Sequence, residues 1–300
     1  MFIRRHIWVV LLVVLMLAGC QSQSAPSVEE EPYIEETDIT FATVDGVELQ
    51  LDLARPSQGE GPFPALVFVC GGGWGLPCRD TLSQPTQWAA ESGYVAAAVD
   101  YRVVLEGRET KYPFPAQVHD VKCAVRWLRA NAEQYAVDPE RIGAIGFESG
   151  GSLALLLGLT DPSDGLEGDC GDTHQPSNVQ AVVSLGGAAD QALLYDATDR
   201  YMQDGLVRLL GGTPDESPEE YRLASPVTYV TADGPPVLSL VGELNERVPP
   251  EQGELLDKRM REVGASHTMT VLEGKTHYDL GNPDPELYET VFEFFDEHLR

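Results

Sequence analysis

R-I-G-A-I-G-F-E-S-G-G-S-L-A, residues 141–154, joins an apolar run to a glycine-rich corner and a leucine-rich continuation. The apolar residues 142–147 are typical of a buried strand, and the leucines after the glycines continue at helical spacing. Gly146 and Gly150 lie two positions either side of Glu148. Because glycine has no Cβ, it lets a strand and the next helix approach closely. The stretch therefore predicts a strand that turns abruptly into a helix, with Glu148 at the corner and pointing into an active site.

Strand and helix patterns alternate on both sides of this corner. Strands are predicted at residues 38–44, 47–53, 64–70, 94–101, 179–185, 237–241 and 268–272, and helices at 81–92, from Pro115 to about 132, at 250–263 and at 285–299. Such alternation predicts an α/β fold, with a mostly parallel central sheet and helices on both faces. Asp45-Gly46 predicts a hairpin between the first two strands. Residues 188–230 interrupt the alternation and predict a small cap over the strand ends.

The first residues of the chain are typical of a targeting segment. Arg4 and Arg5 precede an apolar run, and L-A-G-C at residues 17–20 resembles a bacterial lipobox. Residues 1–19 are therefore interpreted as a lipoprotein signal peptide and Cys20 as the lipidated residue. An ordinary signal peptide or an uncleaved anchor is the alternative. This interpretation predicts an exported protein held on the extracytoplasmic side of the cell membrane by acyl chains.

Composition separates the rest of the chain into two parts. Residues 20–37 are polar, acidic and proline-containing, which predicts a disordered spacer, and residues 38–300 form the predicted folded α/β domain. The chain has 48 acidic and 20 basic residues, a formal net charge of −28. This charge excludes nucleic acid as a partner, because the phosphate backbone requires positive charge. It also argues against an anionic membrane surface as a partner of the protein body.

Four cysteines remain after Cys20. Cys70 ends a predicted buried strand and Cys123 lies on a predicted core-facing helix surface, so both are interpreted as buried thiols. Cys78 and Cys170 lie in loops and are the expected disulfide. The sequence contains no C-x-x-C pair or histidine cluster that would indicate zinc, and we expect neither a metal nor a cofactor.

Several motifs, in order and at matching spacing, resemble those of one enzyme family over residues 38–299. They are C-G-G-G-W (70–74), V-D-Y-R (99–102), Y-P-F-P-A-Q-V-H-D-V-K-C-A-V-R-W-L-R-A-N-A (112–132), the corner itself, L-L-G-G-T-P (209–214), A-S-P-V-T-Y-V (224–230), P-P-V-L-S-L-V-G (235–242), V-P-P-E-Q (248–252) and G-K-T-H-Y (274–278). The chain thereby resembles the bacterial esterase/lipase branch of the α/β-hydrolases, and in particular the bifunctional feruloyl and acetyl-xylan esterase-like group. The resemblance implies an α/β-hydrolase fold, an ester substrate, and a nucleophile elbow at residues 146–150.

The catalytic positions depart from the family pattern. The resemblance places the serine nucleophile at Glu148 and the aspartate at Asn245, whereas the histidine is retained as His277. It also assigns an oxyanion loop to Gly71, Gly72 and Gly73, where the family motif usually opens with histidine and this chain has Cys70. Two of three triad positions have therefore changed.

Ser149 follows the corner, and two roles are open to it. A slip of one residue would make it the nucleophile, but that would put Phe147 where close strand–helix packing requires glycine. In the unslipped register it begins the helix and can present its backbone N–H to an oxyanion.

Glu148 is open to two further interpretations. Its carboxylate could act as a nucleophile or base with His277, as the aspartate at this elbow does in dehalogenases and epoxide hydrolases, with Glu243 or Glu246 replacing the lost acid. Alternatively, Glu148 and His277 form an ion pair that keeps the imidazole charged and unable to act as a base.

We favour a family member whose serine triad is degraded and which binds a small ester-like or carbohydrate-derived ligand at the former active site. An active carboxylic-ester-type hydrolase, with Glu148 or Ser149 as nucleophile, is the alternative. Trp74, Tyr101 and Tyr278 are candidates to line the ligand pocket, whereas Arg102 and Asp120 are expected to be structural.

Overall fold

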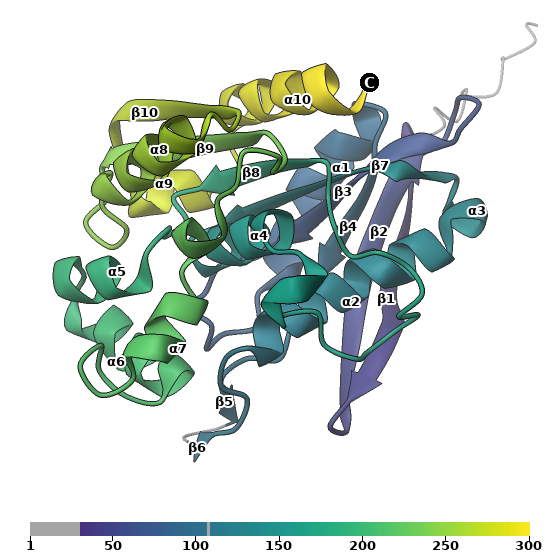
Figure 1. Ribbon diagram of the computed structural model, residues 1–300. Helices are drawn as coiled ribbons and strands as arrows, with labels where there is room; N and C mark the ends of the chain where they lie inside the picture. The colour runs from purple at the N-terminus through teal and green to yellow at the C-terminus, as the bar shows by residue number, and fades with distance from the viewer. Residues whose placement is uncertain (1–30, 107–108) are drawn as a thin grey trace, which may run out of the picture. The chain divides into compact units, whose positions relative to one another are not determined.

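The computed structural model describes residues 31–106 and 109–300, and an eight-stranded mixed sheet forms its centre (Figure 1). The strands of this sheet are β1 (Tyr33–Val44), β2 (Val47–Pro56), β3 (Phe63–Val69), β4 (Val95–Val99), β7 (Val137–Phe147), β8 (Ala181–Leu185), β9 (Val237–Leu244) and β10 (His267–Thr276). Their spatial order is β1-β2-β4-β3-β7-β8-β9-β10. The pairs β1–β2 and β2–β4 are antiparallel, and all the others are parallel. The predicted hairpin and the mostly parallel sheet are thus confirmed.

Helices cover both faces of the sheet, as the alternating pattern predicted. The α-helices are α1 (Ser83–Glu91), α2 (Ala116–Ala130), α3 (Ala132–Tyr135), α4 (Ser149–Leu159), α5 (Gln191–Ala197), α6 (Arg200–Leu210), α7 (Pro218–Leu223), α8 (Glu251–Val263), α9 (His277–Gly281) and α10 (Pro285–Leu299). Short 3-10 helices are η1 (Arg79–Leu82), η2 (Pro162–Asp164) and η3 (Pro226–Tyr229). The strands β5 (Leu105–Glu106) and β6 (Glu109–Thr110) form a separate two-stranded ribbon. None of these helices, within the residues described, is long and apolar enough to cross a bilayer.

The core has two parts because each central strand is buried on both faces. In β3, Ala65, Val67 and Val69 pack with α2 and α4, whereas Leu66 and Phe68 pack with α1 and α10. This alternation follows from the two-residue period of a strand. Figure 1 shows α2 and α4 on one side of the sheet and α10 on the other. A strand covered on both faces reads as a continuous apolar run, which is why β3 was readable from the sequence.

Residues 188–230 contain α5, α6, α7 and η3, which connect the adjacent parallel strands β8 and β9. Helix α6 contributes Tyr201 and Met202 to the cavity at the end of β7 that is described below. The interrupted alternation in this part of the sequence therefore marked a segment that helps to enclose the site.

The sheet begins earlier than the composition predicted. Residues 33–37, assigned to the disordered spacer, form the start of β1, and Tyr33 to Glu36 pair with Leu53 to Pro56 of β2. The acidic side chains there face solvent on an edge strand that pairs with β2, so the composition of the segment was misleading. The predicted signal peptide, Cys20 and the spacer up to residue 30 lie outside the described residues.

The cysteines pair differently from the sequence prediction. Cys70 is bonded to Cys78 and Cys123 to Cys170, with Cα–Cα separations of 5.8 and 5.6 Å. Each buried cysteine thus has a loop cysteine as its partner, so burial did not exclude pairing. The first disulfide closes the loop that contains residues 71–73, and the second joins α2 to the loop after η2.

Candidate functional site

The corner between β7 and α4 keeps the backbone geometry of a nucleophile elbow although its residue is Glu148. Glu148 has φ 55° and ψ −116°, a conformation that costs a non-glycine residue about 1–3 kcal/mol. A Cβ on Gly146 would lie 2.1 Å from the Gly150 oxygen, and one on Gly150 would lie 2.1 Å from the Val69 oxygen. Only glycine allows this approach, so the register predicted from the glycines is correct. Glu148, and not Ser149, occupies the corner.

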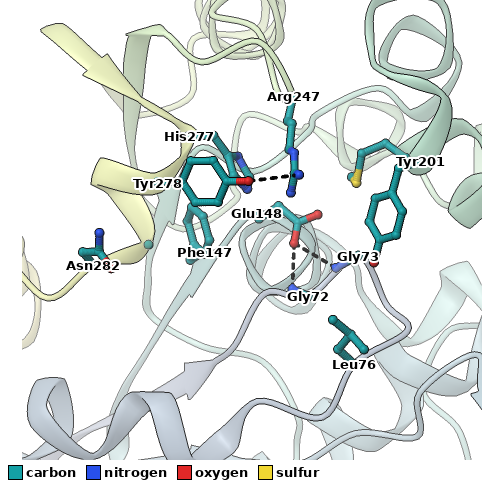
Figure 2. Close-up of a pocket in the computed structure, with 12 residues that line it drawn as sticks. Gly72, Gly73, Leu76, Phe147, Glu148, Tyr201, Arg247, His277, Tyr278 and Asn282 are labelled. Carbon is teal, nitrogen blue, oxygen red and sulfur yellow. Dashed lines mark hydrogen bonds between the residues drawn. The ribbon is translucent and has the colours of Figure 1, made fainter.

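The carboxylate of Glu148 lies against the glycine loop. Its Oε2 accepts hydrogen bonds from the backbone N–H groups of Gly72 at 2.7 Å and Gly73 at 2.9 Å (Figure 2). The residue is only 4% exposed, and it precedes the N-terminus of α4, where the helix dipole favours negative charge. The two amides therefore form an anion-binding pair that the protein's own side chain already occupies.

The other two predicted oxyanion donors lie differently. The hydroxyl of Ser149 donates to Oε2 of Glu148 at 3.3 Å and is buried, so its side chain supports the carboxylate rather than facing ligand. Gly71 makes room for the same oxygen, because a Cβ on it would lie 3.1 Å from Oε2. Within the described residues, neither residue donates a backbone N–H to the carboxylate.

Three polar atoms of the site, on Glu148, Asn245 and His277, are buried without partners in the described structure. His277 begins α9 after β10, and Asn245 follows β9; both are buried. Oδ1 of Asn245 accepts from the backbone N–H groups of Arg247 at 3.2 Å and Val248 at 3.0 Å. Within the described part of the chain, Oε1 of Glu148, Nδ1 of His277 and Nδ2 of Asn245 have no hydrogen-bond partner. The Asn245 side chain therefore has only its Nδ2–H groups left to form hydrogen bonds, and it offers no acceptor to Nδ1–H of His277.

The surroundings of His277 favour the neutral form of its imidazole. Burial lowers its pKa below the ordinary value of 6.5, the Glu148 charge opposes this shift, and the Arg247 charge adds to it. No ion pair or hydrogen bond joins Glu148 to His277 among the residues described, so the structure does not contain the ion pair that the sequence left open as an alternative. Burial outweighs the nearby carboxylate.

Neither Glu243 nor Glu246, the two acids considered as substitutes at the Asn245 position, contacts His277 in the described structure. Glu243 is exposed and its Oε2 accepts the backbone N–H of Gly274 at 2.8 Å. Glu246 is also exposed. Since Nδ1 of His277 has no partner in the described structure, neither glutamate holds the imidazole in the tautomer that a general base requires.

A cavity of about 240 Å³ opens above Glu148 (Figure 2). Its lining residues are Gly72, Gly73, Leu76, Phe147, Glu148, Tyr201, Met202, Arg247, His277, Tyr278, Gly281 and Asn282. Of the three aromatic candidates, only Tyr278 lines it, whereas Trp74 and Tyr101 are buried in the core.

Arg247 and Tyr201 line the cavity but were not predicted from the sequence. Arg247 lies two residues after Asn245, in a segment whose family motif indicates only an acid. Tyr201 lies on the cap, where no motif indicates which side chains face the cavity.

Arg102 and Asp120 form a structural ion pair, as expected. Nε and Nη2 of Arg102 donate to the fully buried carboxylate of Asp120 at 2.8–3.1 Å, and the Arg102 backbone N–H donates to it at 2.8 Å. The pair ties the segment after β4 to α2, away from the cavity.

A Ser–His–Asp hydrogen-bonded chain that the sequence did not reveal lies elsewhere in the fold. Oγ of Ser239 is 3.0 Å from Nε2 of His267, whose Nδ1 is 3.1 Å from Oδ1 of Asp257. Ser239 lies within β9 and is 3% exposed, and the His267 side chain is fully buried. A nucleophile must be reachable by substrate, and neither residue lines the cavity above Glu148. This chain of hydrogen bonds joins β9, β10 and α8 and has no access for chemistry.

A comparison of the sequence with protein families identifies the family to which this chain belongs. The BD-FAE family matches residues 51–260, which contain the elbow, the glycine loop and the Asn245 segment. The chain belongs to the BD-FAE family. Its mostly parallel sheet, its elbow and its esterase relatives confirm the predicted α/β-hydrolase of the esterase type.

The relatives of this BD-FAE member are esterases. Esterase LipC of Mycobacterium tuberculosis is 32% identical over 227 residues, which cover 71% of this chain and 55% of LipC. A truncated carbohydrate esterase from gut microbiota superposes with a TM-score of 0.77 at 27% identity, covering 89% and 97% of the two chains. Esterase Est2 of Thermogutta terrifontis superposes with a TM-score of 0.72 at 26% identity, covering 87% and 90%. The chain spans about half the length of the curated relatives it matches.

Proposed function

We propose that this BD-FAE member binds a small ester-like or carbohydrate-derived ligand at the former active site and lacks ordinary serine esterase activity. The observation behind the proposal is the position of the Glu148 carboxylate, bonded to the N–H groups of Gly72 and Gly73. In ester hydrolysis those donors must receive the oxyanion of the tetrahedral intermediate. A side chain with its own negative charge in that place excludes it.

The occupied donors and the changed acid position both oppose acyl transfer. Loss of one oxyanion-hole donor costs an enzyme about 10²–10³ in kcat, and here both glycine donors are occupied. Replacement of the triad aspartate by asparagine costs a serine protease about 10⁴, because the histidine takes the wrong tautomer. Here Oδ1 of Asn245 is held by two backbone amides, and Nδ1 of His277 has no acceptor in the described structure that would hold its tautomer. The losses act on the same chemical step.

The proposed ligand class rests on the relatives and on the cavity. The relatives include an esterase and a carbohydrate esterase, which supports an ester-like or carbohydrate-derived ligand at the corresponding site of this chain. The cavity of about 240 Å³ lies at the carboxyl end of β7, where ligands of α/β sheets bind. It is smaller than the roughly 300–1,000 Å³ of sites for drug-sized ligands, which favours a small molecule.

The proposed location is the extracytoplasmic face of the membrane, with Cys20 as the lipid anchor. Its support is the sequence alone: Arg4 and Arg5, the apolar run after them, and L-A-G-C at residues 17–20. The anchor can be tested by growing cells that express the protein in medium that contains an alkyne-bearing fatty acid. Label that depends on Cys20, and is lost in Cys20→Ser, is the expected result.

A second candidate function follows from the same carboxylate. Oε2 of Glu148 is held by two amides, whereas Oε1 is unpartnered at the cavity. A carboxylate held this way is able to attack the sp3 carbon of an alkyl halide or epoxide through Oε1, which breaks the carbon–halogen bond and releases halide, or breaks a C–O bond of the epoxide ring; the carbonyl of the resulting ester would keep its place on the amides. His277 would then have to activate water. Its lack of a carboxylate partner is the reason that this remains the second candidate.

Fluorophosphonate labelling tests the absence of serine chemistry. Thermogutta terrifontis esterase 2 is phosphorylated by paraoxon and serves as the positive control. We expect no label on Ser149 or Ser152 under conditions that label the control fully. Stoichiometric label on either serine would show that the protein retains a serine nucleophile.

Oxygen-18 exchange separates the two candidate functions. A single turnover of an alkyl halide or epoxide in H₂¹⁸O through a glutamyl ester would leave ¹⁸O in the peptide that contains Glu148. The binding proposal predicts no incorporation. Incorporation at Glu148 would establish the second candidate instead.

A further inference from the structure

We propose that the cavity binds a small hydroxy-carboxylate, with its carboxylate on Arg247 and its hydroxyl donating to Oε1 of Glu148. This inference rests on the proposed function, because it names the chemical class of the ligand for the same site. Three independent features of the cavity lead to it: an available cation near the opening, an unsatisfied acceptor at the base, and apolar walls between them.

Arg247 is the only lysine or arginine among the described residues that line the cavity. Its Nη2 donates to the hydroxyl of Tyr278 at 3.2 Å, and its guanidinium lies 5.4 Å from the Tyr278 ring and 5.8 Å from the Tyr201 ring. Figure 2 shows it between these two residues, above Glu148. No described residue accepts a hydrogen bond from Nη1. A planar guanidinium held by two aromatic rings is preorganised to bind a carboxylate.

The acidic neighbours of Arg247 leave this role open. Oδ2 of Asp199 is 3.7 Å from Nε of Arg247, beyond hydrogen-bond distance, and its side chain is half exposed, so water screens the pair. Oδ1 of Asp199 accepts the backbone N–H of Met202 and so caps α6. Glu148 makes no ion pair with Arg247, since its Oε2 is held by the glycine amides. The cation therefore has capacity for an external anion.

The base of the cavity requires a hydrogen-bond donor. Oε1 belongs to a residue that is 4% exposed, and within the described chain it has no partner. A Cβ on Gly73 would lie 4.0 Å from Oε1 and 4.0 Å from Cε1 of Tyr201, so this oxygen and the Tyr201 ring border the same space. A buried carboxylate oxygen without a donor is costly, and a ligand hydroxyl would satisfy it. A second carboxylate at this depth would be repelled, which orients the ligand with its anionic end outward.

The walls between the two polar ends are apolar. Seven large apolar or aromatic side chains of the described residues are exposed, and Leu76, Tyr201 and Tyr278 among them line this one cavity. Exposed apolar side chains that cluster at a concave site indicate ligand binding. Phe147 and Met202 extend the apolar lining inward. The body of the ligand is therefore a small ring or short chain.

Calorimetric titration of the purified protein tests the assignment with three matched probes. The first is trans-4-hydroxycyclohexanecarboxylate, the second is the acid without the hydroxyl, and the third is the uncharged hydroxy-carboxamide. Glucuronate has the same two end groups on a polar ring and distinguishes a sugar acid from an apolar acid as the source. None of these probes contains an ester bond, so the outcome is independent of whether the protein hydrolyses esters.

Arg247→Gln provides the decisive comparison, with Arg259→Gln as a matched control because Arg259 lies on the exposed face of α8. We expect the hydroxy acid or glucuronate to bind, Arg247→Gln to weaken it roughly tenfold or more, and the carboxamide to be weak and insensitive to the substitution. Loss of the hydroxyl should weaken binding several-fold.

Three results would overturn the inference: acid and amide of equal affinity, an unchanged affinity in a folded Arg247→Gln variant, or no binding of either acid up to about 10 mM. Esterase turnover together with the expected binding pattern would overturn the proposed function and leave the ligand class standing.

Discussion

Restoring the two altered triad positions should restore esterase chemistry, and the structure shows why both are needed. Glu148→Ser removes the carboxylate from the N–H groups of Gly72 and Gly73 and places a hydroxyl at the elbow. Asn245 would still leave the imidazole without an acceptor at Nδ1. Asn245→Asp keeps one oxygen for the two backbone amides that now hold Oδ1 and provides a second oxygen for Nδ1.

The size of the expected gain follows from these contacts. The single variant Glu148→Ser should show at most the weak catalysis that an oxyanion hole supplies without a working triad, about 10³–10⁴ over water. Adding Asn245→Asp should raise kcat by about 10⁴, equivalent to about 5.5 kcal/mol of activation free energy. The assay is hydrolysis of a p-nitrophenyl acyl ester by the wild type, both single variants and the double variant, with thermal unfolding to show that each is folded. A folded double variant within tenfold of Glu148→Ser would refute the reasoning.

Three other predictions concern parts of the structure that can be tested separately. The His277 imidazole should titrate below pH 6.5 by NMR, and Glu148→Gln should lower the midpoint further, since the Glu148 charge raises this pKa and burial lowers it; a wild-type midpoint above 6.5 would indicate an ion pair instead. Ser239→Ala should reduce the free energy of unfolding by about 1–3 kcal/mol in urea, because its buried histidine partner loses a hydrogen bond, and should not alter ligand binding; reduced binding without loss of stability would contradict the structural role. Replacement of Cys123 and Cys170 by serine should cost about 4 kcal/mol in the chain-entropy treatment of a loop of this length, and a midpoint in urea equal to that of the wild type would argue against this disulfide.

The pH dependence of stability follows from the same histidine. A folded-state pKa below the unfolded value of about 6.5 means that the unfolded chain binds more protons as the pH falls through this range. The contribution of His277 to stability is therefore complete above pH 6.5 and is lost as the pH falls toward the folded-state pKa.

The parts of the fold that were predictable are those in which local pattern and burial agree. The continuous apolar run of β3 and the glycines at the elbow left little choice of backbone, and Gly146 and Gly150 determined the register of Glu148. The start of β1 was not predictable, because an edge strand with solvent-facing acids has the composition of a spacer. A hydrophobic pattern indicates which side chains are buried, whereas the edge strand β1 pairs with β2 through its backbone, which leaves no such pattern.

The candidate site divides in the same way. Glu148, Asn245 and His277 were located by the resemblance to the esterase family, but the occupation of the glycine amides by Glu148 depends on side-chain direction, which a motif does not encode. The predicted Cys78–Cys170 disulfide was wrong, because the partner of each cysteine depends on which residues the tertiary structure brings together. Arg247 and Tyr201 meet at the cavity from separate segments, one after β9 and the other on α6, and no local pattern connects them.

We propose that the Glu148 carboxylate has replaced serine esterase chemistry by ligand binding. Turnover of a short activated acyl ester by the purified wild-type protein, beside Glu148→Ala and a heat-denatured sample, tests this proposal. We expect wild type and variant alike to be no faster than the denatured sample. Multiple turnovers by the wild type that disappear in a folded Glu148→Ala variant would contradict the claim and make Glu148 a catalytic residue.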